Sequence, residues 1–314
     1  MGKSLCEFIA TSRTADGMLP ENFHLPAEEN SEGPAFADGA MDGITMYHMA
    51  PAFLNSPDKK ELGRLIELAA TGAYGEAEDG FKAFCKEHRA LLIIDDLQKY
   101  IVDHERKLDP NKLFEFALNL LLESDNRECV KVGMSILELF DVYENDALAD
   151  TIRIVGLSDE FTLFSAYLMR SWPHAEEELL ELAKRVRGWG RVHCVDMMSA
   201  ELEETRNWLF YHGIDNDVMA AYSAWQVYDK ARVEEILARE NLNYEEIHAL
   251  LMLTEALMDE GPVSGISRMK KPREYLKKVL EQVESVEARL EGNEGFAWSD
   301  EEQQVIEAVK DRLK

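Results

Sequence analysis

The chain has 314 residues, of which 46% are hydrophobic, and its 61 acidic against 34 basic residues give a formal net charge of −27. A surface with this charge repels phosphate backbones and anionic lipid headgroups, because affinity for nucleic acid depends largely on clustered Lys and Arg. We therefore expect neither a nucleic-acid partner nor a membrane partner. The length allows either two compact domains or one elongated repeat array.

Membrane insertion, secretion and disulfide formation are not indicated by the sequence. No run approaches the ~20 apolar residues that cross a bilayer, and the N-terminus lacks the apolar segment of a signal peptide. The cysteines form no CxxC pair, and they stand at Cys6, Cys85, Cys129 and Cys194. Three of them fall in helical apolar patterns, which predicts reduced core residues in a cytoplasmic protein.

Residues 1–57 differ in composition from the rest of the chain. Five of the nine prolines lie here among several glycines, and no helical period persists beyond one turn. This composition predicts an extended arm rather than packed helices. Spaced apolar residues would anchor the arm along a helical body, and they are Phe23, Leu25, Phe36, Ile44, Tyr47 and Phe53.

The arm also contains paired aspartates beside glycines, in the run from Phe36 to Gly43, with His48 following. Such a run could bind a metal ion or a phosphate. The calcium-loop pattern is absent, since no third ligand falls in place and no Glu closes a twelve-residue loop. Asp and Gly in successive turns explain the run adequately, so we predict no metal ligand here.

One amphipathic helix after another follows the arm, most clearly between residues 111 and 229. Asp109-Pro110 marks a helix start with proline in the first turn, and the helix that follows is apolar almost all round. The next helix has a single apolar stripe, which predicts one buried face and one solvent-exposed face. That stripe consists of Cys129, Val132, Gly133, Ile136, Leu137 and Phe140.

A helix pair of this kind cannot bury its own apolar surface and needs a further pair on each side. Similar helix starts recur at Ser124-Asp125-Asn126, Ser158-Asp159-Glu160 and Asp215-Asn216-Asp217. We therefore predict an all-α fold, an α-solenoid of stacked antiparallel helix pairs with an extended N-terminal arm. The loose spacing of the repeats leaves an irregular helical domain as the alternative.

The C-terminal part reads as a cap on this array. A strongly periodic helix from Ile247 to Met258 is closed by Gly261-Pro262, and two highly charged helices with sparse apolar stripes follow. We predict three parts: an arm over residues 1–57 packed on the body, a helical repeat array over 58–265, and a charged helical cap over 266–314. No stretch alternates apolar and polar residues long enough to predict a sheet.

Residues 184–196 are the densest candidate site. Trp189, His193 and Asp196 have the spacing of one helix face, and Arg191 belongs to the longest basic cluster of an acidic chain, which could hold an anionic ligand. We favour a structural interpretation. Glycines would end one helix and start the next, the basic residues would complement the preceding helix C-terminus, and His193 would be packed and hydrogen-bonded to a neighbour.

A second candidate is a set of aromatic and histidine side chains on two predicted helices, near 200–212 and 217–229. If these helices are neighbours, the side chains could line a groove for a peptide or a small molecule. An ordinary aromatic helix interface is the favoured alternative. The set consists of Trp208, Tyr211, His212, Tyr222, Trp225 and Tyr228.

Catalytic signatures are missing from the sequence. It contains no P-loop, GxGxxG, HExxH, GxSxG or kinase motif set, and nothing selects a general acid and base from its many carboxylates. We predict no catalytic residue, no metal ligand and no cofactor. The residues favour a protein without enzymatic activity and leave that question open.

Three runs resemble a group of bacterial helical proteins, and the helix pairs resemble HEAT-like α-solenoids. The runs are Gly190–Asp196, Asn207–Leu209 and Gly213–Tyr222, with further likeness at Asp16–Glu21 and Phe36–His48. Some members are labelled limonene hydroxylase, but this chain has neither a haem-thiolate loop nor an evident iron ligand set. HEAT-like folds also include alkylpurine DNA glycosylases, against which the net charge argues.

We expect a HEAT-like repeat protein whose concave surface binds a protein or peptide. The alternative is an enzyme or small-ligand protein that uses a pocket near Trp189, His193 and Asp196. The sequence leaves the partner and the oligomeric state open. The residues predicted to form the binding surface are Trp189, Arg191, His193, Asp196, Trp208, His212, Tyr222 and Trp225.

Overall fold

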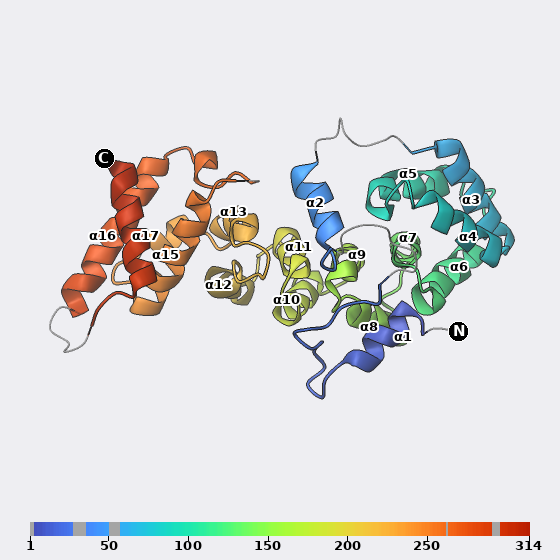
Figure 1. Cartoon of the computed structure of the whole chain (residues 1–314), viewed down its shortest axis with the longest axis horizontal. Coiled ribbons are helices and arrows are strands. Elements are labelled where there is room, and N and C mark those ends of the chain that lie inside the picture. The colour runs from blue at the N-terminus through green and yellow to red at the C-terminus, as the bar shows by residue number, and fades with distance from the viewer. Residues whose placement is uncertain (1–2, 28–35, 50–56, 262, 291–295) are drawn as a thin grey trace. The chain divides into compact units, whose positions relative to one another are not determined.

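The computed structural model describes residues 3–27, 36–49, 57–261, 263–290 and 296–314. All regular elements in these ranges are helices, so the all-α prediction is confirmed. The chain forms two compact units, Met1–Cys194 and Val195–Lys314, which are described separately below (Figure 1). The predicted division into arm, array and cap followed composition, and it stays a prediction.

Unit 1 consists of helices, and short connections join those from α3 onward; α11 crosses its boundary. Its helices are α1 (Leu5–Ser12), α2 (Ala40–His48), α3 (Lys59–Thr71), α4 (Tyr74–Phe84), α5 (Ala90–Asp103), α6 (Pro110–Glu123), α7 (Arg127–Leu137), α8 (Asp146–Val155), α9 (Asp159–Met169), α10 (Ala175–Arg185) and α11 (Trp189–Met197).

The pair α6 and α7 forms the centre of unit 1. The Asp109 side chain caps α6 by accepting from the backbone N–H groups of Asn111 and Lys112, and Pro110 is the first helical residue, as predicted. Every residue of α7 from Cys129 to Leu137 is buried, so the predicted solvent-exposed face is wrong. The reason is that α4, α5, α6 and α9 all contact α7, which is seen nearly end-on in Figure 1.

Unit 1 has two kinds of helix contact. Consecutive helices pack as pairs, namely α3 with α4, α6 with α7, and α8 with α9. Alternate helices also touch, because α3 contacts α5, α5 contacts α7, and α7 contacts α9. The helices α3, α5, α7 and α9 therefore form a continuous row, and the first turns of its later members carry the site described below.

The N-terminal arm contains two short helices, so the prediction of an extended arm is wrong for residues 5–12 and 40–48. In α1 the Ser4 side chain caps the helix, and Leu5 and Ile9, one turn apart, are buried. In α2 Gly39 takes a φ of 74° immediately before the helix. Each helix is too short for its period to stand out in a sequence.

The predicted anchors of the arm differ in their outcome. Leu25 is buried, but Phe36 is 53% exposed and does not anchor the arm in this structure. Phe53 lies outside the described residues. Polar contacts also hold the arm, as the next subsection shows.

Unit 2 is built around α15, which contacts α12, α13, α16 and α17. Its elements are α12 (Glu203–His212), α13 (Ala221–Lys230), α14 (Val233–Leu237), α15 (Tyr244–Met258), the 3-10 helix η2 (Ile266–Arg268), α16 (Pro272–Leu290) and α17 (Asp300–Leu313). Capping boxes at Asn243 and Ser299 begin α15 and α17.

The helix start predicted near Asp215 lies several residues too early. Asn216 Oδ1 accepts from the N–H groups of Val218 and Met219, which forms a turn, and α13 begins only at Ala221. An Asn side chain can satisfy the same N–H groups in a turn as in a helix cap, so the two have the same sequence signature. Of the helices described, none is long and apolar enough to cross a bilayer.

Gly133 allows the close approach of α7 to α6. A Cβ atom at this position would lie 2.8 Å from the Ala117 carbonyl oxygen and 2.8 Å from Leu120 Cβ. We expect Gly133→Ala to lower the free energy of unfolding by about 1–2 kcal/mol, because overpacking outweighs the helix propensity of alanine. Urea denaturation measures the change.

Gly75→Ala is the matched control for Gly133→Ala. Gly75 also lies in a helix, and a Cβ there would meet no atom within 4 Å. Its unfolding midpoint should stay unchanged or rise slightly. Equal midpoints for the two variants would contradict the close packing of α6 on α7.

Candidate functional site

The helix α2 lies against the first turns of α5, α7, α9 and α11. Arg89 directly precedes α5, Glu128 and Lys131 lie in the first turns of α7, and Glu160 lies in the first turn of α9. The aromatic residues of the surface come from α11. We call this surface the α2 seat, and it consists of Arg89, Glu128, Lys131, Glu160, Trp189 and His193.

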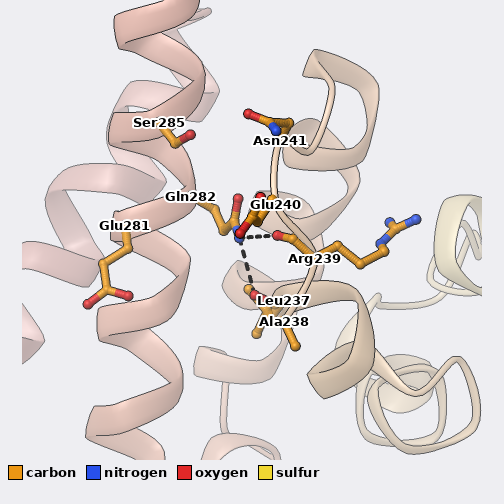
Figure 2. Close-up of a pocket in the computed structure, with 8 residues that line it drawn as sticks. All are labelled: Leu237, Ala238, Arg239, Glu240, Asn241, Glu281, Gln282 and Ser285. Carbon is orange, nitrogen blue, oxygen red and sulfur yellow. Dashed lines mark hydrogen bonds between the residues drawn. The ribbon is translucent and has the colours of Figure 1, made fainter.

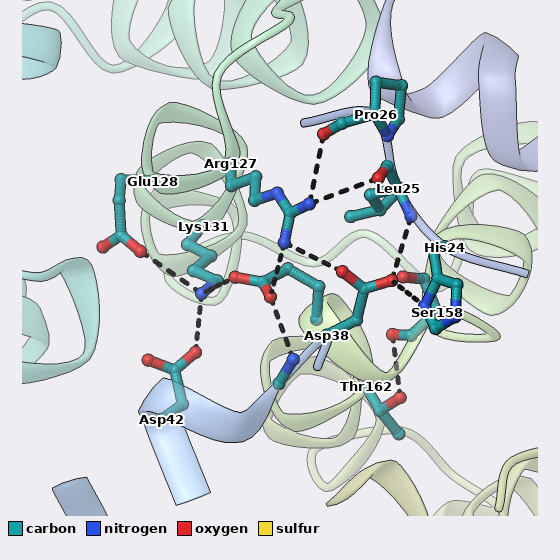
Figure 3. Close-up of polar contacts among 12 residues, drawn as sticks. His24, Leu25, Pro26, Asp38, Asp42, Arg127, Glu128, Lys131, Ser158 and Thr162 are labelled. Atoms are coloured by element: carbon teal, nitrogen blue, oxygen red, sulfur yellow. Dashed lines mark hydrogen bonds and ion pairs between the residues drawn. The ribbon is translucent and has the colours of Figure 1, made fainter. Parts of the chain in front are cut away.

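Lys131 is the centre of the polar half of the seat (Figure 3). Its side chain is 0% exposed, and its Nζ lies 2.6 Å from Asp42 Oδ2, 2.5 Å from Glu160 Oε1 and 3.3 Å from Glu128 Oε1. The three carboxylates come from α2, α9 and α7 itself. A buried ammonium is tolerated only when it is paired in this way, so these helices must meet at this point.

Arg89 completes the binding of Asp42. Its guanidinium donates to Asp42 Oδ1 at 2.8 Å and lies 3.1 Å from Glu128 Oε1. Glu128 in turn accepts from the backbone N–H of Ala90 at 2.6 Å, which satisfies a free donor at the start of α5. The single carboxylate of Asp42, only 2% exposed, is thus shared by two cations.

A second set of contacts holds the chain just before α2. Arg127 binds Asp38 at 2.8 Å and Glu160 at 3.3 Å, and it also donates to the carbonyl oxygens of Leu25 and Pro26. The backbone N–H of Gly39 donates to Glu160 at 2.9 Å. Figure 3 shows these bonds converging on Arg127 and Asp38. Residues 25–26 and 38–42 are therefore tied to α7 and α9 at several points.

The charged state of this cluster follows from its pairing. Burial raises the pKa of Asp42, but Lys131 and Arg89 outweigh burial and lower it. Burial likewise opposes ionisation of Glu160, and Lys131 again prevails, so its pKa is lowered. Burial alone would lower the pKa of Lys131, whereas Glu128, Glu160 and Asp42 raise it. The pairs are therefore ionised at neutral pH.

The second half of the seat is aromatic. Gly43 rests on the Trp189 ring, because a Cβ atom there would overlap the ring carbons. Tyr47, one turn further along α2, is stacked on Trp189 with centroids 5.9 Å apart and on His193 at 6.4 Å. Trp189 and His193 also stack on each other at 6.2 Å. The predicted shared face of these two residues therefore exists, and α2 covers it.

His193 is a packed residue that lacks the hydrogen bond predicted for it. It is 1% exposed, and neither ring nitrogen has a hydrogen-bond partner among the described residues. Burial lowers its pKa to about 4, which Lys131 reinforces and Asp42 opposes. The imidazole is therefore neutral at pH 7.

Arg191 forms hydrogen bonds at the C-terminal end of the preceding helix, α10. Its Nε donates to the carbonyl oxygens of Ala183 and Val186, at the end of α10. This confirms that a basic residue complements the preceding helix C-terminus. The predicted glycine break is confirmed too, because α10 ends at Arg185 and α11 begins at Trp189.

The other predicted site residues lie in unit 2. Asp196 accepts from Gln226 Nε2 at 2.6 Å. Trp208 and His212, on α12, have ring centroids 6.2 Å apart, and His212 Nδ1 lies 3.3 Å from Asp215 Oδ2. The helices α12 and α13 are neighbours, as the groove hypothesis required.

The α13 aromatics take different positions. Tyr222 is buried at 9% exposure. Trp225 has the Arg268 guanidinium 4.4 Å from its ring centroid, and Tyr228 is 5.3 Å away. Part of the predicted aromatic set therefore packs in an ordinary helix interface. A common binding surface for all eight predicted residues stays a prediction.

A pocket of about 360 Å³ lies in unit 2 beside α14 and α16 (Figure 2). Gln282 on α16 donates to the carbonyl oxygens of Leu237 and Arg239, so it caps the C-terminal end of α14. The Gln282 side chain thus links α16 to the C-terminal end of α14 by hydrogen bonds. The lining residues are Leu237, Ala238, Arg239, Glu240, Asn241, Glu281, Gln282 and Ser285.

Across the described ranges, no group of three or more His, Cys, Asp or Glu side chains is arranged to hold a metal ion. No family model, curated protein or solved structure matches the chain. The geometry of the α2 seat therefore carries the functional argument.

Sequence reasoning missed the polar half of the seat. Turns alone account for the two aspartates of the arm in the sequence, and neither Arg89 nor Lys131 belongs to a recognisable motif. One signal was present, since Lys131 stands inside the run Cys129–Leu137, where the other residues are apolar or small. A charge in the middle of such a run indicates a buried partner.

Removal of the buried Lys131 cation should lower the free energy of unfolding far more than removal of an exposed lysine. Lys131→Met removes the ammonium that three carboxylates share and leaves them only Arg89 and Arg127, so we expect the free energy of unfolding to fall by about 3–5 kcal/mol. Lys59→Met is the matched control, since Lys59 is 71% exposed in its pair with Asp96. That change should cost no more than about 1 kcal/mol. Similar urea midpoints for the two variants would exclude a structural role for the buried cluster.

His193 should make the protein sensitive to mild acid. Its pKa is about 4 in the folded state against 6.5 in the unfolded state, so its contribution is complete above pH 6.5 and is lost as pH falls toward 4. Between pH 6.5 and 5 we expect a loss of roughly 1.5 kcal/mol, as up to one proton per molecule is taken up on unfolding. Urea unfolding at both pH values measures it.

His193→Phe keeps a buried ring without a titrating group. The slope of the unfolding free energy against pH should therefore decrease by the equivalent of about one proton. His212→Phe makes the same change at a side chain that is 57% exposed and should leave the slope intact. A slope that is equal in His193→Phe and in the wild type would show that His193 titrates normally.

Proposed function

We propose that this chain is a helical-repeat scaffold of the HEAT-like class that binds another protein or a peptide. The observation that carries the proposal is the docking of α2, a helix of 9 residues, against the first turns of α5, α7, α9 and α11. A surface that holds a short helix of its own chain by specific anchors has the chemistry to hold a helix from another chain.

The helix contacts of unit 1 support the repeat part of the proposal. Consecutive helices pack as pairs, and the alternate helices α3, α5, α7 and α9 touch in succession. Stacked pairs that contact their neighbours in this way are the building principle of an α-solenoid. Such arrays present one row of helices as a binding surface.

The anchors of α2 support the recognition part. One aspartate is bound by a guanidinium and an ammonium, and one tyrosine is stacked on an indole and an imidazole. Charge-assisted hydrogen bonds and aromatic anchors are the groups that select partners in protein interfaces. Together they define which side chains a bound segment must present.

Affinity capture from a cell lysate tests the proposal. The tagged full-length chain should retain at least one protein at near-stoichiometric yield through a moderate-salt wash, as identified by mass spectrometry. A tagged helical protein of similar net charge controls for capture by charge alone. If both baits retain the same proteins, or neither retains any, the scaffold proposal is wrong.

A further inference from the structure

The seat holds α2 by ion pairs and aromatic stacking rather than by buried aliphatic side chains. The buried residues of α2 are Ala40, Asp42, Gly43 and Thr45, so a single alanine supplies the buried apolar side chain. Met46 and Met49 remain 39% and 37% exposed. Little hydrophobic burial stabilises the contact, so the retention of α2 depends on the cations around Asp42 and on the stacking of Tyr47.

On its own α2 is a weak helix. It has 9 residues and no side-chain N-cap, whereas isolated helices shorter than about 12–15 residues are marginal in water. Gly43 in its interior costs a further ~1 kcal/mol relative to alanine. The seat therefore selects a helical conformation that the segment alone would scarcely populate.

We propose that the α2 seat is the recognition site of the scaffold and that it binds, in place of α2, a short helix from a partner protein. That helix carries a carboxylate, a glycine directly after it, and an aromatic residue four positions after the glycine, as in Asp42, Gly43 and Tyr47. This inference rests on the proposed function. In this arrangement α2 is an internal competitor of the partner.

Each element of the pattern has its own subsite. The carboxylate binds between Arg89 at 2.8 Å and Lys131 at 2.6 Å. The glycine is required because any Cβ would overlap the Trp189 ring. The aromatic residue stacks on Trp189 and His193. A segment that lacks the carboxylate deprives Lys131 and Arg89 of one of their partners, one that lacks the glycine clashes with the indole, and one that lacks the aromatic residue uncovers two rings.

Competition with α2 sets the apparent affinity. A tethered segment acts at an effective concentration on the order of millimolar, and a partner binds only the fraction of molecules with a free seat. A change that weakens α2 without altering the seat should therefore raise the affinity for a partner helix. Gly43→Ala is such a change, because its methyl group meets the Trp189 ring while every seat residue is kept.

The probe is a fluorescein-labelled peptide with the sequence of residues 36–49, titrated by fluorescence anisotropy into the full-length chain. We expect Gly43→Ala protein to bind it at least about tenfold more tightly than wild-type protein, because the internal competitor is weakened. Gly75→Ala, where a Cβ meets nothing within 4 Å, should match the wild type. Peptides carrying Asp42→Asn or Gly43→Ala should lose at least about tenfold in affinity.

Two outcomes would overturn the inference. One is equal binding of the peptide to Gly43→Ala and wild-type protein although hydrogen exchange shows α2 released. The other is equal binding of the Asp42→Asn peptide. Should Gly43→Ala fail to fold by circular dichroism, Tyr47→Ala replaces it, since that change removes the stacking without adding atoms.

A result that contradicts the α2 seat as the recognition site can be distinguished from one that contradicts the scaffold proposal. A partner that wild-type protein captures and that Gly43→Ala protein does not bind more tightly would leave the scaffold proposal intact and place its site elsewhere. A dimer of Gly43→Ala protein in native mass spectrometry that the peptide dissociates would assign the seat to a second copy. That result would overturn the proposal of a separate partner.

Discussion

The buried ammonium of Lys131 is the constraint on which unit 1 depends. A charge removed from water costs several kcal/mol unless opposite charges surround it, and Lys131 is fully buried in the central helix α7. Its carboxylates come from α7, α9 and α2. Two of these carboxylates belong to the array and the third belongs to the arm, so Lys131 links the docking of α2 to the packing of α7 on α9.

Under the proposed function, the same ion pairs would let the α2 seat select its occupant by charge as well as by apolar contact. Buried ion pairs add little net stability compared with apolar packing, but the loss of one partner is expensive. A helix that offers no carboxylate to Arg89 and Lys131 would, on this proposal, bind more weakly for that reason. The first turns of α7 and α9 add a favourable field, because helix N-termini attract negative charge.

Much of the fold could be predicted from the sequence, because local signals fixed it. The start of α6 followed from Asp109-Pro110, and the helix from Tyr244 to Met258 followed from its apolar period. The shared face of Trp189 and His193 followed from their spacing. Each of these features depends on residues within a few turns of one another.

The seat could not be predicted, because its contacts are distant in the chain. Asp42 and Lys131 are 89 residues apart, and Asp42 and Arg89 are 47 apart. Helical periodicity shows which residues share a face but not what covers that face, so Trp189 and His193 were assigned to an open surface that α2 occupies. The buried side of α7 was missed for the same reason.

Hydrogen exchange of the α2 backbone, read by mass spectrometry on the full-length chain, tests the central claim most directly. Asp42→Asn keeps the shape of the side chain and removes the charge shared by Lys131 and Arg89. The account predicts that amides of residues 40–48 exchange much faster in this variant while those of α6 keep their protection. Unchanged protection of α2 would show that other contacts hold it and would contradict the account.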